Sequence, residues 1–374
     1  MPLTSKRTDL TRILFRPILL QQDFLEKVGE TLETLRFKGF YRQTDKEASG
    51  FAPLLKQEIE GFASKEDWLD GGMLFMAFRT DTKRLPTGLL KARVKLAVAK
   101  WCEDRGVEKC PAAIKKEIKQ TLEEDLLTRA LPTTKVSEVL IFPARGEIWI
   151  DSTSDKRVDE VRKAIRKLGF EGRVWTPGEH RREDTEDVMQ SSDLGAGVVT
   201  SFYAWLWHRS ETGQGLFNNG AHGQPLHVWI DSRIAFRRLV EEKASTVVTG
   251  DNPADAVTAR AAIANGMVIQ DVRIGLKRED RDYFVTLYGS NMQIKAAQMP
   301  SIQGEESEGQ TAGHANLYDR IFLLSEMNEI LFTLFEIYLH GHLENLDSLN
   351  SQICDWARQD GPSTDVIDAE FEDA

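Results

Sequence analysis

Residues 83–132 read KRLPTGLLKARVKLAVAKWCEDRGVEKCPAAIKKEIKQTLEEDLLTRALP. Pro86 is a helix start signal, and apolar residues then recur at spacings of three and four as far as Trp101. A second helix begins at Pro111 and has an apolar residue at every fourth position. The stretch therefore predicts a helical hairpin. Its apolar positions are Leu90, Val94, Ala97, Val98, Trp101, Ile114, Ile118, Leu122 and Leu126.

The same stretch is strongly basic. From Lys83 to Lys119, eleven Lys or Arg residues stand against four acids, a local balance of +7, whereas the whole chain has a net charge of −11. Because each helix offers only a narrow apolar stripe, we expect the pair to pack on itself, to project from the body and to direct its bases outward. Helices also expose Lys and Arg without any partner, so charge alone assigns no function.

Length and composition indicate a protein of two or three domains without a membrane span. The chain has 374 residues and no uncharged apolar stretch near the ~20 residues that cross a bilayer. Nothing near the start, from Met1 to Leu10, is typical of a secretion signal. Three cysteines, Cys102, Cys110 and Cys354, are too few and too irregular for a disulfide framework or a zinc site. These features favour the cytoplasm.

Apolar periodicity predicts an α+β fold with mixed or antiparallel sheets. Strands are expected at Arg12–Leu20, Met73–Arg79, Val136–Phe142, Glu147–Asp151 and Leu226–Asp231, and in a meander at Met267–Leu276, Tyr283–Tyr288 and Met292–Ala296. Further helices are expected from Asp23, from Val158 to Leu168, at Ser232–Val240, at Ala254–Ala264 and at Leu317–His340.

The expected organisation has seven segments. They are an N-terminal α+β region at 1–85, the hairpin at 86–135, a strand and helix at 136–180, a second α+β region with the meander at 181–300, a mobile loop at 301–316, a helix at 317–342 and an acidic tail at 343–374. The loop is rich in Gly, Ser, Gln and Glu, and the chain beyond Gly361 is expected to be disordered.

A short duplication contains two aspartates that are candidates for the metal-binding carboxylates of a nuclease. Trp-Ile-Asp-Ser occurs at Trp149–Ser152 and again at Trp229–Ser232, each time at an expected strand-to-helix junction. Nuclease carboxylates often lie at such strand ends, which makes Asp151 and Asp231 candidates. Each Asp is followed by Ser and an expected helix, so N-capping is the favoured role.

Other chemical motifs are weak. The sequence contains no phosphate-binding Walker loop, no Gly-x-Ser-x-Gly elbow and no dinucleotide fingerprint. His340 and His342 have no metal-ligating partner at a recognised spacing, so a polar helix end is favoured. Aromatic residues gather on one expected helix, where a buried face is favoured over base stacking: Phe202, Tyr203, Trp205 and Trp207. We therefore expect no catalytic residue, metal ligand or cofactor.

The order of several local signatures resembles the RdgC family of recombination-associated proteins, from about residue 12 to residue 340. Lys83-Arg84-Leu85-Pro86 and Leu131-Pro132 are similar to the family's Lys-x-Leu-Pro and Leu-Pro on either side of a helical hairpin. The other similar segments are Phe37–Phe40, Gly50–Pro53, Glu147–Asp151, Lys156–Gly169, Ile263–Val268 and Lys295. Each match is short, and their common order along the chain is the specific feature.

The resemblance implies a horseshoe-shaped subunit with the hairpin at its tip, and two subunits that close into a ring around DNA. Such a homodimer would bind double-stranded DNA, and single-stranded DNA as well, with little sequence preference, would limit recombinase access and would be associated with the nucleoid. It implies no enzyme activity. The expected DNA-binding residues are Lys91, Arg93, Lys95, Lys100, Lys115, Lys116, Lys119, Lys135, Lys277, Arg278 and Lys295.

Two departures affect the expected ring. Thr133-Thr134-Lys135 stands where the family tends to have Arg-Ala-Phe, whose aromatic ring helps to close the tip. Thr249-Gly250-Asp251-Asn252 replaces a basic loop. Closure at the tip and part of the channel lining are therefore the least supported features.

Two alternative functions remain open. The first is a divalent-metal-dependent DNA exonuclease that uses Asp151 or Asp231. The second is a protein-interaction module of a DNA repair or phage system, whose acidic tail and helix from Tyr318 to Tyr338 bind a partner. Degradation of DNA would indicate the first, and capture of a specific protein without DNA binding the second.

Overall fold

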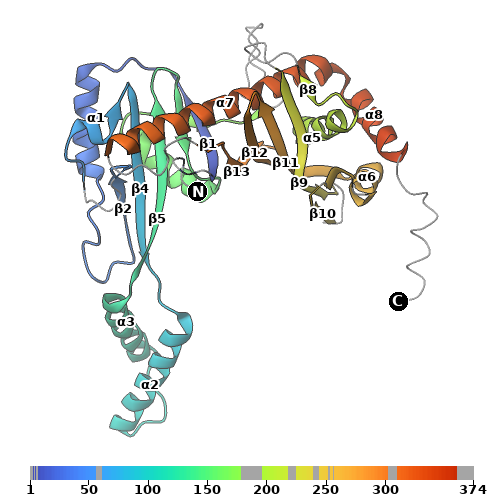
Figure 1. The fold of residues 1–374 in the computed structure, drawn as a ribbon. Coiled ribbons are helices and arrows are strands. Elements are labelled where there is room, and N and C mark those ends of the chain that lie inside the picture. Colours follow the sequence, from blue (N-terminus) through green and yellow to red (C-terminus); the bar gives the residue numbers. More distant parts are fainter. Residues whose placement is uncertain are drawn as a thin grey trace, which may run out of the picture. The chain divides into compact units, whose positions relative to one another are not determined.

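The computed structural model describes residues 3, 5, 7–55, 61–177, 196–217, 225–238, 244–251, 253–255, 257–301 and 310–359. The chain forms two compact units (Figure 1). Unit 1 comprises Met1–Leu14, Trp149–Val158 and Arg173–Ala374, and unit 2 comprises Phe15–Ile148 and Asp159–Gly172. None of the helices in the described ranges is long and apolar enough to cross a membrane.

Unit 2 is an α+β unit built on an antiparallel sheet. Its elements are α1 (Gln22–Leu35), β2 (Glu47–Ala52), η1 (Lys65–Asp67), β3 (Leu69–Asp70), β4 (Met73–Lys83), α2 (Thr87–Arg105), α3 (Ala112–Arg129) and β5 (Pro132–Phe142). β4 pairs with β2, β3 and β5. The chain passes between the two units within β6 (Glu147–Ile150) and within α4 (Asp155–Lys167).

The core of unit 2 explains the run of apolar residues in β4. Residues 73–78 of this strand are all buried, as is typical of a strand covered on both faces. α1 contributes Leu25, Val28 and Leu32, spaced along one face of the helix. Phe170 packs edge-on against Phe24, with 5.4 Å between the ring centroids. The expected helix near Asp23 and the strand at Met73 are thus confirmed.

Unit 1 contains an antiparallel sheet in the order β10-β9-β11-β12-β13-β1. Its strands are β1 (Arg7–Phe15), β7 (Gly172–Val174), β8 (Leu216–Phe217), β9 (Leu226–Arg237), β10 (Ser245–Thr249), β11 (Val268–Arg278), β12 (Arg281–Tyr288) and β13 (Gln293–Gln298). The β11–β12 ladder is continuous from Asp271 opposite Tyr288 to Arg278 opposite Arg281. The expected meander is therefore confirmed.

Helices cover this sheet and supply an aromatic core. They are α5 (Ala196–Glu211), η3 (Pro253–Asp255), α6 (Val257–Ala264), α7 (Gln310–His342), η4 (Leu343–Asn345) and α8 (Leu346–Gln359). α5 packs on β9 and β11 and also contacts α7 and α8. The aromatic residues of α5 that we expected in a buried helix are Phe202, Tyr203, Trp205 and Trp207, and all are at most 2% exposed.

The prediction of a helix at Ser232–Val240 is wrong for the residues that the structure describes, which extend to Arg238. β9 runs without interruption through this sequence to Arg237 and pairs with β10 on one side and β11 on the other. Ile234 and Phe236, two residues apart, are both fully buried. Pairing on both edges satisfies the backbone and overrides the local helical pattern. The second Trp-Ile-Asp-Ser copy therefore lies inside a strand, and Asp231 caps no helix.

The C-terminal part is more helical than expected. α7 begins at Gln310, so the end of the expected mobile loop is helix, whereas residues 302–309 lie outside the described residues. The beginning of the expected acidic tail forms η4 and α8, and α8 buries Leu349, Ile353 and Ala357. The expected disorder beyond Gly361 lies outside the described residues.

Candidate nucleic-acid interface

The predicted basic hairpin is formed by α2 and α3, which pack against each other. In the chain, the two helices follow β4 and precede β5. The β4–β5 ladder extends to Lys83 opposite Pro132, so two paired strands support both ends of the insertion. Gly106 ends α2 with φ 63°, a left-handed conformation that suits glycine at a helix end. Pro111 then precedes α3.

The inner faces of the two helices are only half-buried. All nine apolar positions expected on the stripes have intermediate exposure. α2 has no buried residue, and α3 buries only Leu127 among its own residues. The outward face of α2 is partly apolar, with Leu89 45% exposed and Leu96 69% exposed. The insertion therefore has little core of its own and exposes most of its side chains.

Seven of the predicted DNA-binding residues lie on this insertion, and all seven are exposed: Lys91, Arg93, Lys95, Lys100, Lys115, Lys116 and Lys119. In the described part of the chain, no ion pair neutralises any of the first six. Lys46 pairs with Glu123, and together with Lys119 it lowers the pKa of Glu123, despite the opposing effect of burial. Arg129 pairs with Asp125 at 2.9 Å. Glu123 and Asp125 are thus paired near the end of α3, whereas Glu117 lies between Lys116 and Lys119 in the sequence.

Lys135 lies on the β4–β5 ladder that supports the insertion. It is exposed and stands opposite Thr80. The neighbouring Thr134 stands opposite Asp81, a buried carboxyl group. Burial raises the pKa of Asp81, but hydrogen bonds from Arg79 and Thr134 outweigh this and lower it. Thr133-Thr134-Lys135 therefore belongs to a paired strand, in which the Thr134 hydroxyl group is hydrogen-bonded to Asp81.

The other three predicted residues lie in unit 1 and have different surroundings. Lys277 is exposed and pairs with Asp282 at 3.7 Å. The Lys295 ammonium group lies 3.3 Å from the centroid of the Tyr288 ring. Arg278 is only 5% exposed and lies 3.7 Å from Glu326, so this side chain belongs to the interior of unit 1.

Glu326 interacts with two further side chains besides Arg278. It accepts a hydrogen bond from the hydroxyl group of Tyr283 and pairs with Arg281 at 2.8 Å. Burial and the neighbouring Glu326 carboxylate raise the pKa of Tyr283 far above its usual value. Lys277 and Arg278 are adjacent on β11 and point to opposite faces of the strand, so Arg278 shares the buried face with Ile274 and Leu276.

A second surface of unit 2 with several bases was missing from the predicted residues. A groove next to β2 is lined by the bases Arg36, Lys163 and Lys167 and by the acids Glu47 and Glu160. Lys163 and Lys167 are four residues apart on α4 and therefore lie on one face of the helix. Residues 156–167 contain six Lys or Arg and two acids, and this charge together with the spacing of Lys163 and Lys167 was the signal in the sequence.

The alternative chemical sites do not assemble into a metal centre in the described residues. Asp231 pairs with Arg273 at 2.8 Å, and Asp151 is buried. Burial, with the nearby positive charge of Arg209, lowers the pKa of His342, whose ring packs against Trp205. Among the residues that the structure describes, no group of three or more His, Cys, Asp or Glu side chains could hold a metal ion.

The fold and this surface define an α+β protein with a two-helix insertion that exposes uncompensated positive charge. Residues 16–177 match the family model described as "RdgC: Putative exonuclease, RdgC". This range includes α2, α3 and the strands that support them. The resemblance of the sequence to the RdgC family is therefore confirmed.

Two relatives are both named recombination-associated protein RdgC. The protein from Cupriavidus necator is 30% identical over 118 residues, which are 30% of this chain and 39% of that protein. The protein from Cupriavidus pinatubonensis is 24% identical over 277 residues, which are 72% of this chain and 81% of that protein. The first match thus spans well under half of that relative's length.

Proposed function

We propose that this protein binds double-stranded DNA without sequence preference, and single-stranded DNA as well, through the α2–α3 insertion. The observation that carries the proposal is the set of exposed bases, six of which have no ion-pair partner within the described ranges. The family match over the insertion and the name of the two relatives add support.

The proposed mechanism is electrostatic. Lys and Arg side chains neutralise phosphates and release condensed counterions, which supplies affinity without reading the bases. The chain is acidic as a whole, with a net charge of −11, so attraction is confined to its basic surfaces. Acidic surface elsewhere repels nucleic acid and limits contact to these places.

Fluorescence anisotropy with two unrelated labelled duplexes tests this function. We expect similar affinities for both duplexes, and a fall of about 10³-fold or more between 50 and 200 mM salt if six or more phosphates are contacted. No binding at low salt, or an affinity that does not change with salt, would contradict the proposal. A single strand of the same sequence serves as the second ligand.

We further propose that two horseshoe-shaped subunits form a ring around the duplex, with the insertion at the tip, and that the ring limits recombinase access in the nucleoid of the cytoplasm. Leu96 and Leu131, 69% and 88% exposed, are apolar side chains that a second subunit could cover. Leu131 and Pro132 directly precede the segment Thr133–Lys135, in which the family's aromatic residue is missing.

Scattering and mass measurement in solution test the ring. A homodimer with a central hole is expected, and a compact monomer at all concentrations would contradict it. Closed circular DNA should also retain the protein longer than linear DNA of equal length at high salt, because a ring leaves a linear molecule by sliding off its ends. Equal retention would exclude enclosure while leaving DNA binding intact.

A DNA exonuclease is the second candidate, because the description of the matching family model contains that activity. Asp151 and Asp231 are the residues to examine. Incubation of end-labelled linear DNA with the protein and Mg²⁺ or Mn²⁺ separates the two candidates. Release of mononucleotides that is lost in Asp151→Asn or Asp231→Asn would support the enzyme, and binding without degradation would remove it.

A further inference from the structure

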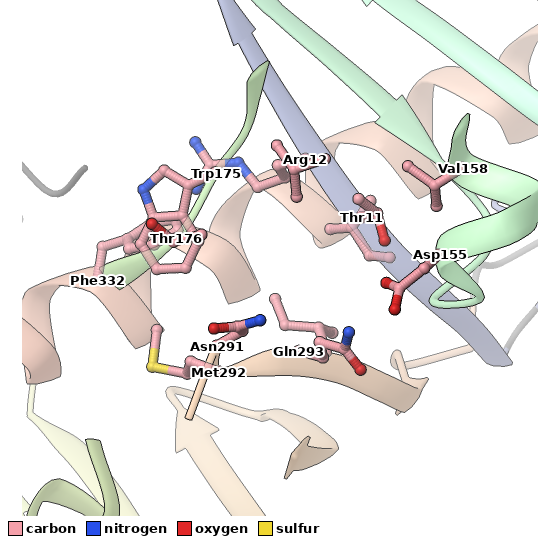
Figure 2. A pocket seen from close by; sticks show the side chains of 13 residues that line it. Thr11, Arg12, Asp155, Val158, Trp175, Thr176, Asn291, Met292, Gln293 and Phe332 are labelled. Carbon is pink, nitrogen blue, oxygen red and sulfur yellow. The ribbon is translucent and has the colours of Figure 1, made fainter. Parts of the chain in front are cut away.

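Unit 1 contains a pocket that none of the predicted DNA-binding residues lines. It is formed by β1, the first turn of α4, the residues that follow β7, the β12–β13 turn and α7. All of its lining residues belong to unit 1. Figure 2 shows the aromatic side chains of Trp175 and Phe332 on one side of the pocket and Asp155 on the other.

The aromatic side of the pocket is held in place by several contacts. The indole of Trp175 meets the ring of Phe332 edge-on, with 5.0 Å between the centroids. The guanidinium group of Arg12 lies 4.2 Å from the Phe332 centroid and 5.8 Å from that of Trp175. The backbone N–H of Trp175 also donates to the carbonyl oxygen of Arg12 at 2.8 Å. A fixed ring of this kind offers a stacking surface to a flat ligand.

The polar side of the pocket has unused hydrogen-bonding capacity. Its groups are the Asp155 carboxylate and the carboxamides of Asn291 and Gln293. Within the described ranges, none of these three side chains has a hydrogen bond or ion pair. Together they provide donors and acceptors, and the carboxylate adds acceptors only.

The turn that presents the two carboxamides is conformationally strained. Met292 stands between them, is 2% exposed and has φ 47°, in the left-handed region that disfavours a side chain. The backbone there places Asn291 and Gln293 at the same edge of the pocket, as Figure 2 shows.

We propose that this pocket binds one unpaired nucleobase. A base is flat, so it can lie against Trp175, and its edge carries both donors and acceptors that carboxamides can match. Asp155 can accept from an exocyclic amino group, which adenine, cytosine and guanine have and thymine lacks. The pocket therefore favours bases with an amino group. This recognition goes beyond the phosphate contacts proposed for α2–α3 and depends on none of their residues.

Two sources could supply the base: a free nucleotide, or an unpaired base in a nucleic acid. The first experiment compares a duplex that has a single bulged adenosine with the same duplex that has an abasic residue in the bulge, by anisotropy. The bulged adenosine should bind about tenfold more tightly, as stacking of a single base on an aromatic side chain allows. Bulged thymidine should fall between the two. Equal affinity for the adenosine and abasic duplexes excludes an unpaired base in DNA as the source.

Variants of the pocket show whether the preference arises there. Asn291→Ala combined with Gln293→Ala should lower the ratio between the affinities for the adenosine and abasic duplexes, with unchanged affinity for the fully paired duplex. Asp155→Asn should reduce the preference for adenosine over thymidine. Gln352→Ala removes an exposed carboxamide of α8 in the same unit and should change nothing. Unchanged ratios in the pocket variants would overturn the proposal.

Equilibrium dialysis with dAMP separates this proposal from the DNA-binding function. If the protein binds no duplex, the proposed DNA-binding function fails. The pocket proposal would still stand if the protein binds dAMP and the double variant Asn291→Ala and Gln293→Ala does not. The ligand of the pocket would then be a free nucleotide. Absence of both dAMP binding and the bulge preference overturns the pocket. Circular dichroism confirms that each variant is folded.

Discussion

The α2–α3 insertion and the α5–α7 region are both helical and both carry apolar stripes, yet they differ in what surrounds them. Phe202 on α5 is fully buried against Phe335 and Tyr338 of α7, with ring centroids 5.1 and 5.3 Å away. Trp101 on α2 is only half-buried. The first region contributes to the core of the fold, whereas the second exposes charge. Apolar spacing alone does not distinguish a core from a surface; the elements packed around it do.

The largest effect is expected in the aromatic core. Phe202→Ala should lower the free energy of unfolding by about 3–5 kcal/mol, because it removes a buried ring and leaves a cavity. Urea unfolding followed by circular dichroism measures this. Leu89→Ala, at a position 45% exposed on α2, is the control and should stay within about 0.5 kcal/mol of the wild type. An equal loss of unfolding free energy in the two variants would contradict the difference between the two regions.

The second prediction concerns DNA affinity. Lys91, Lys95, Lys115 and Lys116 replaced together by Glu should weaken duplex binding by about a hundredfold at low salt and reduce the salt dependence, because phosphate contacts are lost. The free energy of unfolding should barely change, since all four side chains are exposed.

The matched control for that variant has the same change in net charge on exposed bases elsewhere in unit 2. It replaces Arg16, Lys27, Lys38 and Arg42 by Glu. A smaller loss of affinity than in the insertion variant is expected. If both variants weaken binding equally, net charge rather than the insertion determines affinity.

The third prediction uses the alkaline response of the aromatic core. Burial raises the pKa of Tyr338 to about 12, although a hydrogen bond with Ser201 acts in the opposite direction. A tyrosine whose pKa is raised in the folded protein stabilises the fold fully below pH ~10, its unfolded value, and this contribution is lost as the pH rises towards 12.

Tyr338→Phe should therefore lose less stability than the wild type between pH 10 and 12, by on the order of 2 kcal/mol. At neutral pH the variant should be about 1 kcal/mol less stable, because the Tyr338 hydroxyl group donates to the carbonyl oxygen of Val198 at 2.9 Å. Urea unfolding at several pH values measures both effects. Parallel alkaline curves would mean that Tyr338 ionises as easily in the folded state as in the unfolded state.

The smallest effect is expected at the end of α2. Gly106→Ala should cost about 1 kcal/mol, because φ is 63° there and a side chain disfavours this conformation. No atom lies within 4 Å of the added carbon, so the cost is conformational alone. Gly88→Ala, inside the first turn of the same helix, is the control and should be neutral or slightly stabilising. Thermal unfolding compares the two.

The sequence by itself determined the elements that depend on local pattern. The two helices of the insertion, their half-buried stripes, the exposure of their bases, the meander and the buried aromatic face of α5 all follow from periodicity, start signals and charge. The resemblance to the RdgC family was expected from about residue 12 to residue 340, and the family model matches residues 16–177.

Only the tertiary structure decided the features that depend on distant neighbours. β9 continues through Ser232 because β10 and β11 pair with both of its edges, which the residues near Ser232 do not encode. Arg278 is buried beside Glu326, a residue far away in the sequence, although Lys277 next to it is exposed. The pocket at Trp175 likewise joins segments far apart in the chain. Local propensity fixes which element forms, whereas strand pairing and burial depend on contacts between remote residues, and these appear only in the folded protein.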